Sequence, residues 1–349
     1  MVKENCGVVG IHSLDGVNVI PMLIDSLRAL QHRGQEAWGI AVPNKSPLKK
    51  IGLVSSSASE FKKISMEYSS ASAIGHVRYS TIGKSNIDNA QPLKVRDLCV
   101  AHNGTISNVE ELSNVVGGCS FTPQNTSDTM IAAQRLVSLI KEKGQMSKAL
   151  SILKNEMIGS YCFTFLSDDT SVYAARDPCG FRPLVLGEKN DGRVHIVASE
   201  SSAFSAIGAE LIRDVSPGEL IKFSKNGIES QSFSEDKTHA HCSFEFTYFA
   251  HPTSKMEGSN IYVARKRIGK YLARKFPIKD ADLVIPVPDS ARPAALGFAQ
   301  ELGVPFDEGL LKDRYSKKGP LRSFIEPHQT ESIEITRWNN PIREIIQNK

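Results

Sequence analysis

The chain has 349 residues, which at roughly 150 residues per domain favours two domains. A hydrophobic share of 40% and a charged share of 23% exclude collagen-like, fibrous and largely disordered chains. The net charge of +4 comes with short basic runs only, and no apolar run reaches the roughly 18 residues of a membrane helix, so neither a nucleic-acid nor a membrane partner is expected.

The cysteine pattern and the N-terminus narrow the class of protein further. Six cysteines are spread along the chain, and no two of them form a Cys-x-x-Cys pair. This spacing supports neither a zinc ribbon nor a thioredoxin-type motif, so no metal site is expected. The N-terminus lacks the basic and then apolar layout of a signal peptide, which predicts a cytoplasmic protein.

Hydrophobic periodicity predicts strands mixed with two helices before residue 235. Residues 8–11 are a short apolar run typical of a buried strand, and residues 20–30 repeat apolar side chains at helical spacing. A second helix is predicted around residues 130–140, with Asp128 among its available caps. Strand-like segments separated by turns then follow as far as residue 223. Helices segregated from strands in this way predict an α+β architecture.

A polar stretch at residues 232–241 is the expected domain boundary, since it holds few large apolar residues. Beyond it the pattern predicts, in order, a helix, a strand, a helix and a strand: residues 263–272, 282–287, 292–302 and 305–311. A strand, a helix and a further strand are the beginning of a parallel sheet. Because one such unit cannot cover both faces of a parallel sheet, the second domain is expected to be incomplete.

Cys6 is the first residue in the sequence with a possible catalytic role. It follows residues 1–5 and opens the first predicted strand. If residues 1–5 are a leader that is removed, the Cys6 thiol lies beside a free α-amino group. Such an amine, with a pKa of about 7.7–8.0, can act as a general base near neutral pH without a histidine. The alternative is a core cysteine close to an exposed chain start.

Other segments also carry polar groups in unusual places. Arg78 lies in the strand-like residues 75–81, where burying an unpaired charge would be costly. Asn103 and Gly104 follow an apolar run, so a side-chain amide and a backbone N–H meet at a strand end, as in an oxyanion hole. Taken singly, Asn-Gly is typical of a turn, Arg78 of a surface and Asp128 of a helix cap.

Taken together, these segments resemble the class II, or N-terminal-nucleophile, glutamine amidotransferases. Five motifs occur in the order found in that family: Cys-Gly-Val-Val-Gly-Ile, His-Arg-Gly-Gln, Gly-His-Val-Arg-Tyr-Ser-Thr, Ala-His-Asn-Gly and Thr-Ser-Asp. The resemblance implies a leader at residues 1–5, followed by a four-layer αββα N-terminal-nucleophile hydrolase domain at residues 6–235.

The same resemblance implies a role for each residue of the motifs. Cys6 would attack the carboxamide of glutamine and give a thioester and ammonia. Asn103 and Gly104 would stabilise the oxyanion, and Arg33 would order the site. The residues implied in glutamine binding are Arg78, Asp128 and His76. An arginine fork suits the α-carboxylate of glutamine, and an aspartate suits its α-ammonium group.

Further segments narrow the resemblance to the amidophosphoribosyltransferase family. They are Ser-Glu-Ser at residues 199–201, Cys-Ser-Phe-Glu-Phe-Thr-Tyr-Phe-Ala at 242–250, Ala-Arg-Lys-Arg at 264–267 and Val-Pro-Asp-Ser-Ala-Arg-Pro-Ala-Ala at 287–295. Members of that family pass ammonia from glutamine to phosphoribosyl pyrophosphate (PRPP), which gives 5-phosphoribosylamine, the first step of purine synthesis. The resemblance implies an incomplete type I phosphoribosyltransferase α/β domain at residues 236–349. The contacts it implies for pyrophosphate or PRPP are Asp289, Ser290, Lys312 and Arg314.

The sequence departs from the family near its end. The main PRPP motif, two acidic residues followed by a Thr- and Gly-rich loop, is expected just after Arg343, and the sequence stops at Lys349. PRPP, with any Mg²⁺ that it carries, is therefore expected to bind only with a complementing chain. Cys242 matches one iron–sulfur ligand, but the Cys-x-x-Cys ligands are missing, so neither a cluster nor another firmly bound cofactor is expected.

Three functions remain open from the sequence. The leading one is a glutamine amidotransferase of the amidophosphoribosyltransferase kind, acting as a homo-oligomer or as a hetero-oligomer with an intact paralogue. The second is a free-standing glutaminase or amidase, and the third is a non-catalytic regulatory subunit. Glutaminase activity that Cys6→Ala abolishes would exclude the third.

Removal of residues 1–5 is directly measurable. The intact mass of the purified protein is expected to be that of a chain that begins at Cys6. The α-amine of Cys6 can act as the base only when Cys6 is the first residue. A preparation that hydrolyses glutamine while keeping Met1 would contradict this expectation.

Overall fold

The structure is a computed structural model that describes residues 6–79, 87–116, 127–236, 238–312 and 339–347. It divides into two compact units. The first comprises Met1–Glu245 with Phe249–Gly258, and the second comprises Phe246–Tyr248 with Ser259–Lys349. The first unit therefore continues past the domain boundary predicted at residue 235.

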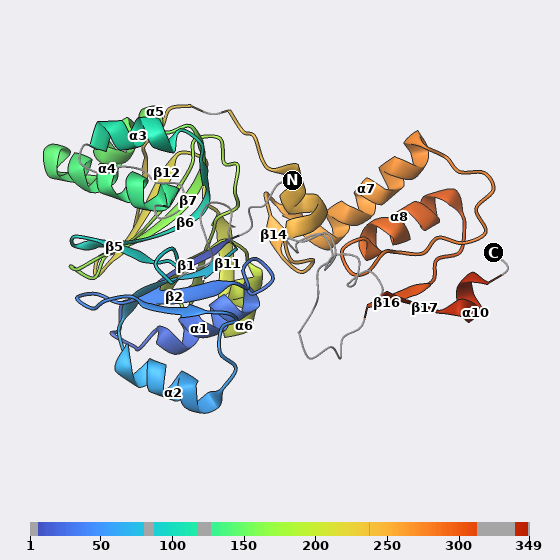
Figure 1. Cartoon of the computed structure of the whole chain (residues 1–349), viewed down its shortest axis with the longest axis horizontal. Coiled ribbons are helices and arrows are strands. Elements are labelled where there is room, and N and C mark those ends of the chain that lie inside the picture. Colours follow the sequence, from blue (N-terminus) through green and yellow to red (C-terminus); the bar gives the residue numbers. More distant parts are fainter. Residues whose placement is uncertain (1–5, 80–86, 117–126, 237, 313–338, 348–349) are drawn as a thin grey trace. The chain divides into compact units, whose positions relative to one another are not determined.

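Two antiparallel sheets form the centre of the first unit (Figure 1). The first sheet contains β1 (Gly7–Ser13), β2 (Ala37–Ala41), β3 (Leu48–Ile51), β4 (Ser72–Arg78), β9 (Val185–Lys189), β10 (Val194–Ala198) and β11 (Glu210–Asp214). Its strand order is β11-β9-β10-β1-β4-β2-β3. The second sheet contains β5 (Leu93–Val95), β6 (Leu98–Ile106), β7 (Gly159–Ser167), β8 (Val172–Arg176), β12 (Glu219–Ser224) and β13 (Gly227–Ser232). Its order is β13-β12-β8-β7-β6-β5.

Helices cover the outer face of each sheet. Against the first sheet lie α1 (Ile20–Ala29), α2 (Ala58–Glu67) and α6 (Ser202–Ile207). Against the second lie α3 (Val109–Val116), α4 (Asp128–Lys143) and α5 (Met146–Glu156). A third apolar cluster, with Val8 of β1 and Ala101 of β6 among its members, fills the space between the sheets. The predicted α+β fold with its four-layer order αββα is thus confirmed.

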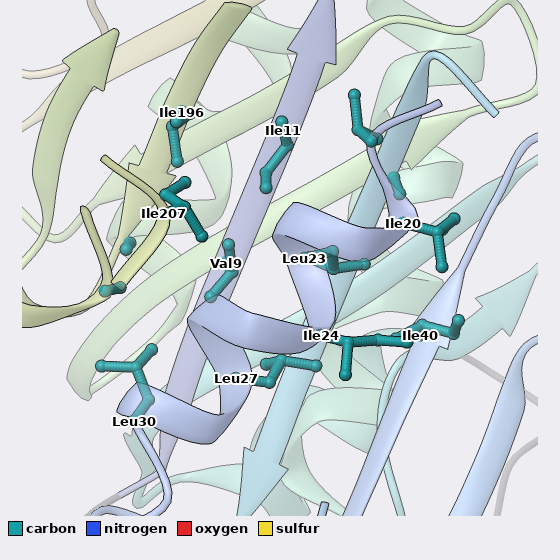
Figure 2. Close-up of a cluster of buried hydrophobic side chains, with 14 of the residues drawn as sticks. Val9, Ile11, Ile20, Leu23, Ile24, Leu27, Leu30, Ile40, Ile196 and Ile207 are labelled. Atoms are coloured by element: carbon teal, nitrogen blue, oxygen red, sulfur yellow. The ribbon is translucent and has the colours of Figure 1, made fainter. Parts of the chain in front are cut away.

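Strand β1 is buried on both faces, because α1 covers one face of the first sheet and the second sheet covers the other. Its side chains alternate: Val9 and Ile11 pack under α1, whereas Val8 faces the second sheet. Figure 2 shows Leu23 and Leu27 of α1 above β1, one helical turn apart. This packing holds the strand rigidly, and with it the residue just before it, Cys6.

The second unit is built around two helices, α7 (Ile261–Lys275) and α8 (Arg292–Leu302). Glycines allow their backbones to touch: a Cβ at Gly269 would lie 1.9 Å from the carbonyl oxygen of Ala294. Near the chain end, β16 (Leu310–Lys312) pairs antiparallel with β17 (Asn339–Pro341), which precedes α10 (Arg343–Ile346). The remaining short elements are η1 (Glu245–Phe249), β14 (Lys255–Met256) and β15 (Ser259–Asn260).

The predicted strands at residues 282–287 and 305–311 are shorter in the structure. A single parallel bridge joins Val284 to Phe306, and the second segment continues only as β16. The parallel direction agrees with the predicted β-α-β order. Because strands are held by hydrogen bonds to neighbours, one bridge among the described residues does not make the ladder that the pattern predicts.

Within the described residues, none of the helices is both long and apolar enough to cross a bilayer.

Candidate active site

Cys6 lies directly before β1 and is partly buried. Its thiol donates to the carbonyl oxygen of Tyr79 and accepts from the N–H of the same residue, each at 3.4 Å. Burial raises the pKa of the Cys6 thiol, although Arg78 and Arg33 act on it in the opposite direction. A thiol in this state needs a base to become the thiolate nucleophile.

The carbonyl group of Cys6 is held by a buried arginine. Nε of Arg33 donates to this oxygen at 2.9 Å, and the guanidinium is 1% exposed. Its other nitrogens donate to Glu200 at 2.5 Å and to Glu245 at 2.7 and 2.9 Å. Arg33 therefore holds the backbone at Cys6 through one hydrogen bond, and the two carboxylates neutralise its charge.

Glu200 has further partners besides Arg33. It also accepts from His32 Nε2 at 2.9 Å, from Ser254 Oγ at 2.7 Å and from the N–H of His251 at 2.8 Å. Burial alone would raise the pKa of Glu200, but the charges and hydrogen bonds of its partners hold that pKa well below its ordinary value. Glu200 is accordingly an ionised, fully engaged partner of Arg33.

Asn103 and Gly104 lie on β6, whose register pairs them with Cys162 and Tyr161. The Asn103 side chain is completely buried, and within the described residues neither its Oδ1 nor its Nδ2 has a hydrogen-bond partner. Leaving a buried amide unsatisfied costs about 1–3 kcal/mol. Gly104 has φ +147°, and a Cβ there would lie 2.0 Å from the carbonyl oxygen of Ser160, so only glycine fits.

Arg78 and Asp128 come from the two halves of the sandwich. Arg78 ends β4, the neighbour of β1, and its side chain is buried. Asp128 begins α4, and its Oδ2 accepts from the N–H of Ile106 at 3.1 Å, which places it at the end of β6. Both residues, with Arg33, act electrostatically on the Cys6 thiol. The fold thus gathers these predicted residues around Cys6.

His76 is also on β4 but lies deeper. Its side chain is fully buried, and its Nε2 bonds the carbonyl oxygen of His102 at 3.1 Å. Burial lowers the pKa of His76 to about 3, so the ring is neutral near pH 7 and Nε2 donates to that carbonyl. His76 supports the strand that carries Asn103.

The residues predicted for PRPP belong to the second unit. Asp289 and Ser290 lie in the turn before α8, where Asp289 Oδ1 accepts from Arg292 at 2.7 Å. Arg292 also pairs with Glu308 at 2.9 Å. Lys312 ends β16, and Arg314 lies outside the described residues. Asp289 is therefore engaged by a neighbouring cation in this structure.

Cys242 lies in the first unit, where it is buried. Its Sγ is 3.9 Å from a guanidinium nitrogen of Arg182. In the part of the chain that the structure describes, no three His, Cys, Asp or Glu side chains are grouped so as to hold a metal ion.

Sequence reasoning gave no role to Glu200 or Glu245. Both lie in segments on which the family resemblance was noted, yet nothing in the sequence pairs either with Arg33. The available signal was physical: a buried arginine requires carboxylates, so acidic residues in otherwise apolar segments were the candidates.

A family model identifies the class of protein that this chain resembles. Residues 76–206 match the family model described as a glutamine amidotransferase domain. This stretch contains Asn103 together with Arg78 and Asp128, two of the residues gathered around Cys6. The match indicates a glutamine amidotransferase domain within the first unit.

Comparisons over the whole chain identify a particular family among the glutamine amidotransferases. The amidophosphoribosyltransferase of Archaeoglobus fulgidus is 40% identical over 98% of this chain and 75% of its own length. That of Methanothermobacter thermautotrophicus is 38% identical over 100% of this chain and 73% of its own. A solved glutamine PRPP amidotransferase from B. subtilis, complexed with ADP and GMP, gives a TM-score of 0.79 at 32% identity and covers 98% of this chain and 73% of that one. The chain belongs to the amidophosphoribosyltransferase family and is an enzyme.

Removing the Arg33 charge is expected to destabilise the first unit strongly. Arg33→Met keeps most of the volume but removes the cation that Glu200 and Glu245 share, which leaves Glu200 with His32 and Glu245 with Arg182. The expected cost is about 3–5 kcal/mol in the free energy of unfolding. Urea unfolding measures this loss. Arg193→Met, at an exposed ion pair with Asp15, is the matched control and is expected to change stability by less than about 1 kcal/mol. Equal effects of the two exchanges would contradict the assigned role of Arg33.

Because the buried His76 ring is neutral near pH 7, the stability of the protein is expected to depend on pH. Unfolded histidine has a pKa of about 6.5, whereas the folded value is about 3, so between these values the unfolded state binds the extra proton. Stability is full above about pH 6.5 and falls as the pH drops toward 3, by up to about 1.4 kcal/mol per pH unit for this group. His76→Gln is expected to make the decline shallower in urea unfolding between about pH 7 and 5. An unchanged slope would contradict this.

Proposed function

We propose that the chain hydrolyses glutamine at the site around Cys6 and supplies the ammonia for transfer to PRPP. The observation that carries the first half is the buried Asn103 amide, which lies within β6 and has no hydrogen-bond partner among the described residues. A polar group left in this state suits a ligand that bears a developing negative charge. Family membership supports the second half, since a solved relative is a PRPP amidotransferase.

Each proposed step uses a residue of the site. Once residues 1–5 are removed, the α-amine of Cys6 takes the thiol proton, and Sγ attacks the carboxamide carbon of glutamine. Asn103 Nδ2 and the Gly104 N–H donate to the oxyanion that forms. The C–N bond then breaks, and the leaving amide nitrogen takes the proton back and departs as ammonia. Water hydrolyses the remaining thioester and releases glutamate.

Two charged side chains are proposed to bind glutamine, and a third residue is proposed to support the neighbouring strand. The Arg78 guanidinium pairs with the α-carboxylate, and Asp128 pairs with the α-ammonium group. His76 acts indirectly, by holding the carbonyl oxygen of His102. Arg33 keeps the Cys6 backbone in place and does not touch the substrate.

The proposal also covers the domain organisation, the cellular location and the oligomeric state. Residues 6–235 form the glutaminase domain, and residues 236–349 contribute to a phosphoribosyltransferase domain with Asp289, Ser290, Lys312 and Arg314 as contacts for pyrophosphate. The enzyme acts in the cytoplasm as an oligomer, either of this chain alone or together with an intact paralogue.

Replacing the nucleophile tests the proposal directly. Cys6→Ala is expected to lower glutamine hydrolysis by about 10⁴-fold or more, because no thioester can form. Ammonia and glutamate release measure the hydrolysis, and phosphoribosylamine formation after addition of PRPP measures the transfer. Cys179→Ala, at a partly buried cysteine that no proposed step uses, is the matched control and is expected to keep full activity. A wild-type chain that releases no ammonia would favour the regulatory subunit instead.

A further inference from the structure

Beside the proposed substrate site, a polar network surrounds the Asp128 carboxylate. Its members are Gln91, His102 and Thr129, and all three side chains are buried. We infer that Thr129 is a positioning residue that fixes the Asp128 carboxylate for the α-ammonium group of glutamine. This inference rests on the proposed function and adds to it a residue that does not touch the substrate.

The Thr129 hydroxyl has three partners in the structure. Its oxygen lies 3.1 Å from Gln91 Nε2, 3.0 Å from His102 Nδ1 and 3.2 Å from Asp128 Oδ1. A hydroxyl offers one donor and two acceptor positions. The carboxylate can only accept and the amide nitrogen can only donate, so the hydroxyl donates to Asp128 and accepts from Gln91.

The remaining acceptor position assigns the proton on His102. Since the Thr129 hydrogen goes to Asp128, Nδ1 of His102 must donate to the hydroxyl, and Nδ1 carries a proton. Every donor and acceptor of the Thr129 hydroxyl is then used. A hydroxyl held in this way has one orientation, and that orientation aims its hydrogen at Asp128 Oδ1.

One oxygen of the Asp128 carboxylate accepts two hydrogen bonds from described residues, and the other oxygen accepts one. Oδ1 accepts from both the N–H and the hydroxyl of Thr129, at 2.7 and 3.2 Å. Oδ2 accepts from the Ile106 N–H, and the side chain keeps 10% exposure. An ionised carboxylate has about four acceptor sites, so Oδ2 retains capacity for an ammonium group. Without the Thr129 hydroxyl, Oδ1 keeps only the Thr129 N–H and can rotate more freely.

The same network also holds the strand that carries Asn103. Gln91 Oε1 accepts from the N–H of His102 at 2.7 Å, and His76 Nε2 donates to its carbonyl oxygen. His102 directly precedes Asn103 and Gly104 on β6. The distance between the carboxylate and the proposed oxyanion donors is therefore set by a single group of side chains.

Thr129→Val tests this role because valine keeps the shape and removes the hydroxyl. The full chain is assayed with glutamine and with 4-carbamoylbutanoate, which has the same carboxamide and carboxylate but no amino group. The KM for glutamine is expected to rise about tenfold with little change in kcat, the effect of losing one hydrogen bond to a charged group. The KM for 4-carbamoylbutanoate is expected to stay unchanged, and Thr129→Ser is expected to restore wild-type values.

Thr164→Val is the matched control. Thr164 is also fully buried, on β7, and within the described residues its hydroxyl has no hydrogen-bond partner. The same exchange is expected to leave both KM values unchanged there. If Thr129→Val does not unfold cooperatively, Thr129→Ala carries the test, since it removes the same hydroxyl, and the same selective rise in KM is expected.

Two results would overturn the inference: an unchanged KM for glutamine, or an equal rise for both substrates. Failure of the proposed function looks different, since the wild-type chain would then not hydrolyse glutamine at all. Binding measured by calorimetry decides the role of Thr129 in that event. A selective loss of affinity for glutamine over 4-carbamoylbutanoate in Thr129→Val supports the inference, and no selective loss overturns it.

Discussion

The buried Arg33 charge is the constraint on which the arrangement of the site depends. A guanidinium removed from water must be matched by carboxylates, and Arg33 meets this requirement with Glu200 and Glu245. Because its Nε also holds the carbonyl oxygen of Cys6, the same pairing fixes the backbone at Cys6, the proposed nucleophile. Glu245 and residues 249–254 belong to the first unit, and Ser254 and the backbone of His251 complete the shell of Glu200.

Around this centre the fold divides the proposed chemistry between its two sheets. The first sheet supplies Cys6 at the start of β1 and Arg78 at the end of β4, adjacent antiparallel strands whose register brings these ends together. The second sheet supplies Asn103 on β6, and α4 supplies Asp128 beside the end of that strand. The apolar cluster between the sheets holds the two halves at a set separation, so the position of each group depends on packing far from it.

Elements with strong periodicity were predictable, and those whose stability comes from packing were not. The helix at residues 20–29 shows a clear apolar stripe, and all of that stripe is buried against the first sheet. Helix α2 was not predicted, because Ile64 is its single buried side chain and the rest of its sequence is polar. In the second unit, apolar runs predicted two full strands, but the structure shows one bridge and a short β16, since apolar runs do not specify their hydrogen-bonding neighbours.

The sequence by itself determined the chemical identity of the site: a cysteine near the chain start, an Asn-Gly pair, and an arginine and an aspartate in motifs of the amidophosphoribosyltransferase family. Only the tertiary structure decided which of these groups have hydrogen-bond or ion-pair partners, and which residues those partners are. Arg33 meets Glu245 across 212 positions of sequence, and Asn103 is left without a partner among the described residues. The physical reason is that hydrogen bonds and ion pairs act over a few ångströms in space, and the packing of the sheets sets those distances.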